Sequence, residues 1–204
     1  MEVNRRTQAD RTAATKAALT AAARRLFAEH GYGNVGTQAI VEAAGVSRGA
    51  LYHQFGDKLG LFTAVYEDTE AEAVGRAMAI VAEAGDDDPL AALLRGFDEV
   101  VAALTDPGMS RILLIDAPAV LGWEEWRARG EAYGLAVIEG LMNHAIAIGR
   151  IPDQPVRPTA HVLLGAIDES ALYVSRAADP DRARAEVRAV AERLIAALAL
   201  PLEG

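Results

Sequence analysis

Apolar side chains recur at intervals of three and four residues through every long segment of this chain, and that spacing most restricts its fold. In residues 12–30, for example, Ala18, Leu19, Ala22 and Leu26 fall on one side of a helix. No stretch shows the strict apolar–polar alternation that marks a half-buried strand. The sequence therefore predicts an all-α fold.

Glycines, prolines and capping residues divide the chain into about nine expected helices. Gly31, Gly45 and Gly56 each follow an apolar-periodic segment and end it. Asp88-Pro89 and Asp179-Pro180 place a capping carboxylate before a proline at the first helical position. The expected helices cover 12–30, 37–44, 48–54, 58–83, 88–105, a short one from 110 interrupted near Pro118, 122–148, 156–177 and 180–199, with a break at 85–88.

Charge is divided unequally along the chain. Residues 1–60 carry eight basic and five acidic side chains, whereas residues 61–204 carry twelve basic and twenty-four acidic ones. A basic head on an acidic body can approach phosphate groups with one end only. An acidic body also favours solubility, so the asymmetry alone does not decide between these two readings.

Composition and motif spacing argue against several other classes of protein. There is no cysteine, which excludes disulfides and thiolate metal sites, and the four histidines do not show the HExxH spacing. No glycine-rich phosphate loop follows a strand, so we expect no enzyme, metal or cofactor site. No run of eighteen apolar residues is present and the N-terminus is polar, so we expect a cytoplasmic protein without a membrane span.

Residues 37–54 carry the pattern of a helix-turn-helix. A short helix at 37–44, a tight turn at 45–47 and a second short helix at 48–54 make up the motif. Ser47 can cap the second helix and offer its hydroxyl to a phosphate. Leu51 and Phe55 are four residues apart and face inward. The outward face of the second helix, which suits a major groove, then consists of Arg48, Gly49, Tyr52 and His53.

The run from Ala44 to Lys58, AGVSRGALYHQFGDK, resembles the N-terminal domain of TetR-type bacterial transcriptional regulators. Leu26-Phe27 and Gly31-Tyr32 before the run, and Leu61-Phe62 after it, extend the resemblance over residues 12–65. The rest of the chain is similar only in being an all-helical body of the expected length. The resemblance implies a three-helix DNA-binding domain at 1–60 and a helical ligand-binding and dimerisation domain at 61–204.

The resemblance further implies a homodimeric, ligand-responsive repressor that places the helix at 48–54 of each subunit in a major groove of a palindromic operator. Two alternatives stay open: an activator, and a helix-turn-helix interaction protein without a small-molecule effector. Gly36 stands where the family usually has Ser or Thr, which weakens a cap, and Val41 replaces the usual Ala. By position, the DNA-binding residues would be Thr37, Gln38, Ser47, Arg48, Gly49, Tyr52, His53 and Lys58, with Lys58 on a phosphate.

The body carries candidate ligand residues. Its alanine- and glycine-rich helices leave volume unfilled, so we expect an apolar cavity among the helices between 88 and 177, suited to a small hydrophobic or aromatic effector. Trp123 and Trp126 share a helix face and belong either to this pocket or to the core. Asp168 interrupts an apolar helix and needs a partner. The full candidate set is Asp116, Trp123, Trp126, His144, Asp168 and Tyr173.

The last two expected helices, at 156–177 and 180–199, are predicted to form the dimer interface. The apolar face from Val187 to Leu198 is large for a surface left in water. Gly165 and Ala166 permit close approach of a second helix. We expect these helices to pair with their copies in a four-helix interface around a two-fold axis.

Overall fold

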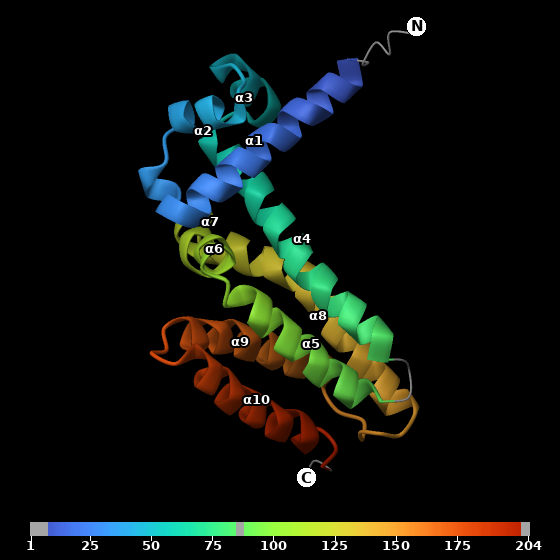
Figure 1. Cartoon of the computed structure of the whole chain (residues 1–204). Helices are drawn as coiled ribbons and strands as arrows, with labels where there is room; N and C mark the ends of the chain where they lie inside the picture. The colour runs from blue at the N-terminus through green and yellow to red at the C-terminus, as the bar shows by residue number, and fades with distance from the viewer. Residues whose placement is uncertain (1–7, 85–87, 201–204) are drawn as a thin grey trace, which may run out of the picture.

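The computed structural model describes residues 8–84 and 88–200, and the regular elements in these ranges are all helical (Figure 1). This confirms the all-α prediction, with ten α-helices in the described ranges rather than about nine. The predicted break at 85–88 lies mostly outside the described residues. The helices are α1 (Gln8–His30), α2 (Thr37–Ala44), α3 (Arg48–Phe55), α4 (Lys58–Ala84), α5 (Pro89–Leu104), α6 (Pro107–Ser110), α7 (Ala117–Leu121), α8 (Trp123–Ala147), α9 (Val156–Ser175) and α10 (Pro180–Ala197).

The head consists of α1, α2, α3 and the beginning of α4. In its core Phe27, Leu51 and Phe62 are completely buried, and the rings of Phe27 and Phe62 meet edge to face with their centres 5.5 Å apart. Gly60 lies where α4 passes close to the end of α3, because a Cβ there would stand 2.1 Å from the carbonyl oxygen of Phe55. The α3–α4 junction therefore requires glycine at this position.

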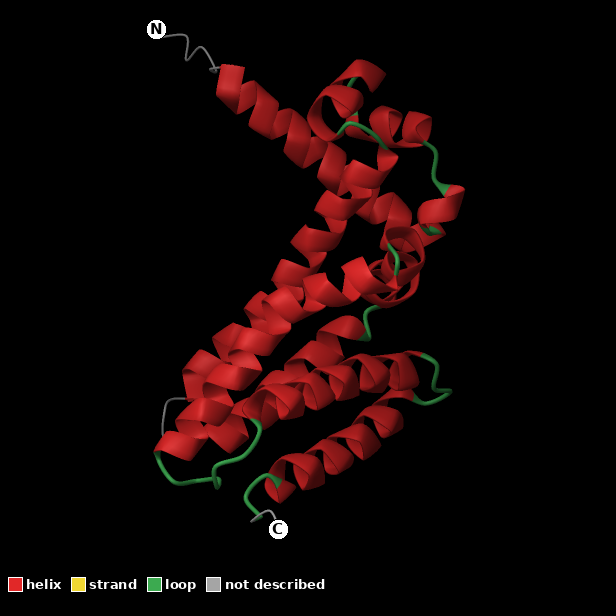
Figure 2. Cartoon of the chain, turned by 180° about the vertical axis from the view of Figure 1, so that it is seen from behind, coloured by secondary structure: helices red, strands yellow, loops and turns green. Residues whose placement is uncertain are grey.

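The body is a layered bundle that α4 joins to the head (Figures 1 and 2). After leaving the head, α4 packs along α5, while α8 packs on α9 and both contact α5. The last helix, α10, lies against α5 and α9 at the end of the molecule away from the head. None of the helices within residues 8–84 and 88–200 is both long and apolar enough to cross a membrane.

The interruption expected near Pro118 takes an unexpected form, because the chain stays helical from α6 to α7. The connecting turn η2 (Arg111–Asp116) is π-helical, so its bonds reach back five residues. Pro118 has no N–H to donate to the carbonyl of Leu113, five residues earlier. That carbonyl instead accepts a hydrogen bond of 2.8 Å from Nε1 of Trp126. The proline therefore widens the helix rather than ending it.

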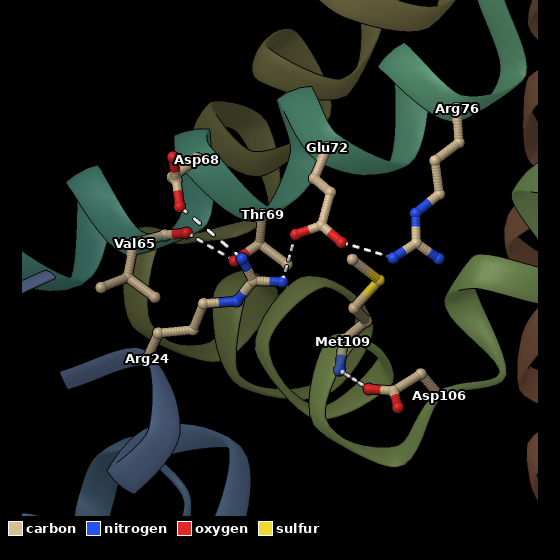
Figure 3. A network of polar contacts seen from close by, with 8 residues as sticks. All are labelled: Arg24, Val65, Asp68, Thr69, Glu72, Arg76, Asp106 and Met109. Atoms are coloured by element: carbon tan, nitrogen blue, oxygen red, sulfur yellow. Dashed lines mark hydrogen bonds and ion pairs between the residues drawn. The ribbon is translucent and has the colours of Figure 1, made fainter. Parts of the chain in front are cut away.

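Polar contacts between α1 and α4 tie the head to the body (Figure 3). The guanidinium of Arg24 in α1 lies 2.6 Å from Oε2 of Glu72 and 3.7 Å from Oδ2 of Asp68, both in α4. Arg76 holds the other oxygen of Glu72 at 2.5 Å. Next to this network, a Cβ on Gly108 in α6 would lie 2.9 Å from Cβ of Ala28 in α1. The head thus rests directly on the part of the body that leads into the π-helical turn.

Candidate functional site

The exposed face of α3 has the composition predicted for a DNA-reading surface. Ser47 caps the helix, and its Oγ accepts a hydrogen bond of 3.3 Å from the backbone N–H of Ala50. Leu51 is fully buried and Phe55 packs against the core, which leaves the opposite face in solvent. Arg48, Gly49, Tyr52 and His53 are all exposed on that face.

Arg48 and Tyr52 form one polar unit on this face. The Arg48 guanidinium donates a hydrogen bond of 3.2 Å to the Tyr52 hydroxyl and lies 5.5 Å from the centre of the ring. This hydrogen bond and the positive charge of Arg48 lower the pKa of Tyr52, and a hydrogen bond with the Thr37 side chain acts in the same direction. The structure therefore brings together three of the predicted DNA-binding residues, from α2 and α3.

The beginning of α2 shows the weak cap that Gly36 predicted. Gly36 stands at the N-cap without a side-chain hydrogen bond, while Val41 is buried beneath the helix. Gln38 is exposed in the first turn, and its amide donates a hydrogen bond of 2.6 Å to Oε1 of Glu42. Of the two predicted contact residues of α2, Thr37 lies next to Tyr52 of α3, and Gln38 is hydrogen-bonded to Glu42 within its own helix.

Lys58 lies against Tyr32 in the turn after α1. Its ammonium donates a hydrogen bond of 2.6 Å to the Tyr32 carbonyl and lies 3.9 Å from the centre of the Tyr32 ring. Desolvation lowers the pKa of Lys58, although the nearby negative charge of Asp116 opposes this shift. A phosphate contact, as predicted for Lys58, would compete with this partner or use the remaining N–H donors of the ammonium.

Asp116, predicted as a ligand residue, instead belongs to the joint between head and body. Its Oδ2 accepts a hydrogen bond of 2.7 Å from the backbone N–H of Tyr32, and it does not line the cavity. Tyr32 is thus held at its N–H by Asp116 and at its carbonyl by Lys58. We call this arrangement of Tyr32, Lys58 and Asp116 the Tyr32 clamp.

The body contains a cavity of about 110 Å³ that is lined by α4, α5, α8, α9 and the π-helical turn. Its wall is mainly apolar and includes Phe97, Leu113, Trp126 and Leu164. Four polar side chains interrupt this wall and are close enough to interact with one another. We call them the polar cluster: Tyr66, Glu70, Arg127 and Asp168.

Two of the six predicted ligand residues, Trp126 and Asp168, line this cavity. Trp123 is 65% exposed and Tyr173 is 53% exposed, so neither points into the bundle. His144, in the last turn of α8, is not part of the cavity wall either. Of the two tryptophans, Trp126 lines the cavity, whereas Trp123 lies on the surface and belongs to neither pocket nor core.

Burial sets the protonation behaviour of the polar cluster. It raises the pKa of Asp168 to about 6, even though Oδ2 of Asp168 lies 2.9 Å from the Arg127 guanidinium. Burial also raises the pKa of Glu70 to about 7, against the opposing effect of a hydrogen bond with the Tyr66 hydroxyl. Oε2 of Glu70 is buried and meets no hydrogen-bond partner among the described residues.

Sequence reasoning missed Tyr66, Glu70 and Arg127. Glu70 lies four residues after Tyr66 on the α4 stripe that also carries Phe62 and Ala73. A carboxylate on an apolar stripe was the signal that identified Asp168, and the same signal was present at Glu70.

Two family models match the chain and together span most of the head and the body. Residues 19–65 match the family described as "Bacterial regulatory proteins, tetR family". Residues 90–198 match the family described as "Tetracyclin repressor-like, C-terminal domain". The stretch between the two matches, residues 66–89, contains the later part of α4, the helix that joins head and body.

Similar proteins agree with these matches. The HTH-type transcriptional repressor AcnR of Corynebacterium glutamicum is 43% identical over 77 residues, which are 38% of this chain and only 37% of that relative. A solved TetR-family transcriptional regulator of Pectobacterium atrosepticum is 30% identical, covers 96% of this chain and 99% of its own, and has a TM-score of 0.80. RolR, solved with resorcinol, shares the fold at 20% identity and a TM-score of 0.68, over 97% of this chain and 99% of its own. The chain belongs to the TetR family of bacterial transcriptional regulators.

Proposed function

We propose that this protein is a homodimeric repressor that binds a palindromic operator through α3 and leaves it when a small apolar or aromatic ligand enters the body cavity. The observation that carries the DNA-binding part is the Arg48–Tyr52–Thr37 group on a basic head, in which Arg48 and Tyr52 are exposed. Arginine offers bidentate donors to guanine or phosphate, and a phenol both donates and accepts. Repression is proposed because relatives that match part of this chain, such as AcnR, are named transcriptional repressors.

The DNA-binding residues of the proposal are those predicted from the sequence. Exposed Gln38, Ser47, Gly49 and His53 surround the Arg48–Tyr52 pair on the surface formed by α2 and α3. Lys58 joins them by exchanging the Tyr32 carbonyl for a phosphate oxygen, which repays the loss of its present hydrogen bond.

The proposed dimer pairs α9 and α10 with their copies in a second subunit. Part of the apolar face of α10 already serves the subunit core, because Ala191 and Ile195 are buried. Val190 and Leu194 remain about half exposed on the same helix, and α9 adds exposed Val162. These apolar side chains on two adjacent helices support burial against a second copy of this chain.

The cavity supports a compact ligand. Its volume of about 110 Å³ is somewhat smaller than the roughly 150 Å³ of an engineered cavity that accommodates benzene. A single ring fits this scale better than a long acyl chain does. Among structural neighbours, RolR was solved with resorcinol and the FadR of Bacillus subtilis with stearoyl-CoA, so the fold accommodates both sizes.

Two walls of the cavity lead to the Tyr32 clamp, and they offer the route from ligand to DNA. Leu113 and Leu114 of the π-helical turn line the cavity, and Asp116 at the end of that turn holds the N–H of Tyr32. Helix α4 lines the cavity through Glu70, and Lys58 at its start holds the Tyr32 carbonyl. A ligand that binds one arrangement of these walls more tightly than another shifts the protein toward that arrangement and so moves the head. The size of the shift is set by the difference between the two affinities.

A gel-shift assay with the DNA upstream of the protein's own gene tests the proposal. We expect retention that weakens steeply as salt rises, since phosphate contacts release counterions. Sedimentation of the same sample should give a dimer. A monomer at micromolar concentration, or retention of no DNA fragment at low salt, would contradict the respective part of the proposal.

A further inference from the structure

The polar cluster has hydrogen-bonding capacity that the protein does not use. The Tyr66 hydroxyl is paired with Glu70, and the Arg127 guanidinium lies 2.9 Å from Oδ2 of Asp168. Among the buried side-chain atoms of the cluster, Oε2 of Glu70 has no hydrogen-bond partner among the described residues. Because buried polar atoms are nearly always paired with protein or ordered water, an acceptor left free beside a cavity is open to a donor that a ligand can supply.

The polar cluster also contains more acidic than basic side chains. Arg127 is the single basic residue among the described residues that line the cavity, whereas two acidic residues, Glu70 and Asp168, line it. Arg129 stands nearby, but its guanidinium is occupied by Glu67 and by Glu125 at 2.7 Å. The site therefore offers acceptors to a ligand and lacks a free cation.

We propose that the ligand is a compact ring compound whose neutral hydroxyl donates a hydrogen bond to Oε2 of Glu70 while its ring packs on the apolar wall. This inference rests on the proposed ligand-responsive function and assigns the chemistry of that ligand. Phe97, Trp126 and Leu164 supply the apolar wall, and the cavity volume of about 110 Å³ favours a single ring.

The same contacts disfavour charged ligands. A carboxylate would add a third acidic group to a cluster whose guanidinium is already paired with Asp168. An ammonium would meet the carboxylates, but it would lose its hydration among walls that are otherwise apolar, at a far higher cost than a neutral hydroxyl. A neutral donor satisfies Glu70 without either penalty.

Calorimetric titration of the full-length protein with four ring compounds of similar size tests this chemistry. The probes are phenol, toluene, benzoate and benzylammonium. We expect phenol to bind about tenfold more tightly than toluene, which is the ratio that one well-formed hydrogen bond to a buried acceptor supports. Benzoate and benzylammonium should both bind more weakly than phenol.

Substitutions at Glu70 separate hydrogen bonding from ring packing. Glu70→Leu removes the acceptor and keeps an apolar side chain of similar size, so the ratio of phenol to toluene affinity should fall to about one while toluene still binds. Glu70→Gln keeps a neutral acceptor and should give an intermediate ratio even if the Leu variant folds poorly. Glu83→Leu, an exposed carboxylate on the same helix, is the matched control and should leave all four affinities unchanged.

The outcomes separate this inference from the function on which it rests. Tighter binding of benzoate or benzylammonium than of phenol, or an unchanged phenol-to-toluene ratio in both Glu70 variants, would overturn the neutral-donor proposal and leave the DNA-binding function standing. Failure of the protein to retain its upstream DNA without any ring compound would reject the DNA-binding function, while the four affinities would still report on Glu70.

Discussion

The head and the body of this regulator are both helical, but they place their polar side chains on opposite sides of the packing. The head turns Arg48 and Tyr52 into solvent above a core in which Leu51 is completely buried. The body turns Glu70 and Asp168 inward, toward a cavity that its own side chains do not fill. A surface that reads DNA needs a rigid support, whereas a site that senses a ligand needs unfilled volume and unmet hydrogen bonds.

The largest effect should come from opening a cavity in the head. Leu51→Ala should lower the free energy of unfolding by about 2–5 kcal/mol, because the side chain is completely buried. Urea unfolding followed by circular dichroism measures the change. Leu163→Ala, in the body next to the existing cavity, is the comparison, and an equal loss there would contradict the contrast between a filled head and an unfilled body.

Removing the cation of α3 should separate DNA reading from ligand sensing. Arg48→Ala should weaken operator binding by about 1–3 kcal/mol, since it removes a guanidinium and its hydrogen bond to Tyr52. Phenol binding should stay the same, as measured by calorimetry. Arg184→Ala, an exposed arginine on α10, controls for charge and should leave operator affinity unchanged.

The buried carboxyl of Glu70 should make stability depend on pH in the body alone. Its pKa in the folded protein is about 7, above the ordinary value of 4.5, so its stabilising contribution is complete below pH 4.5 and is lost as pH rises through 7. Between pH 5 and pH 8, wild type should lose about 1–2 kcal/mol more than Glu70→Gln does. Urea unfolding at both pH values measures these losses. If wild type and Glu70→Gln lost the same free energy of unfolding between pH 5 and pH 8, the buried-carboxyl assignment would be contradicted.

The smallest effect concerns Lys58, which stands between the two regions. If its ammonium leaves Tyr32 for a phosphate, Lys58→Met should flatten the logarithmic salt dependence of operator binding by about one unit. Gel shifts over a range of salt concentrations measure the slope. An unchanged slope would leave Lys58 with its role in the Tyr32 clamp and remove it from the DNA contacts.

The sequence predicted features that depend on neighbouring residues better than features that depend on contacts between distant segments. Arg48 and Tyr52 were placed correctly on an exposed face because a four-residue helical spacing decides their position locally. The cavity wall depends instead on how α4, α8 and α9 meet, and no local pattern specifies that packing. Trp123 and Trp126 show the limit: helical spacing put them on one face, yet the start of α8 leaves the first in solvent.

Asp116 and Pro118 were misread for a related reason. Their roles depend on partners far away in the chain, namely the backbone N–H of Tyr32 and the indole of Trp126. The π-helical turn that contains Asp116 has no signature in apolar spacing, because its five-residue bonds shift the register only locally. Whether a helix breaks at a proline therefore depends on which group bonds the freed carbonyl, and that group cannot be identified from the local sequence.

The hydrogen bond from Trp126 to the Leu113 carbonyl gives this protein an optical reporter of its own. The chain has two tryptophans, and Trp123 is mostly exposed, so its emission reports on bulk solvent. In a Trp123→Phe background, the remaining indole would lie with its ring at the cavity wall and its N–H on the π-helical turn. A shift in its emission maximum or lifetime would then follow the turn as it moves, in real time and without an attached dye.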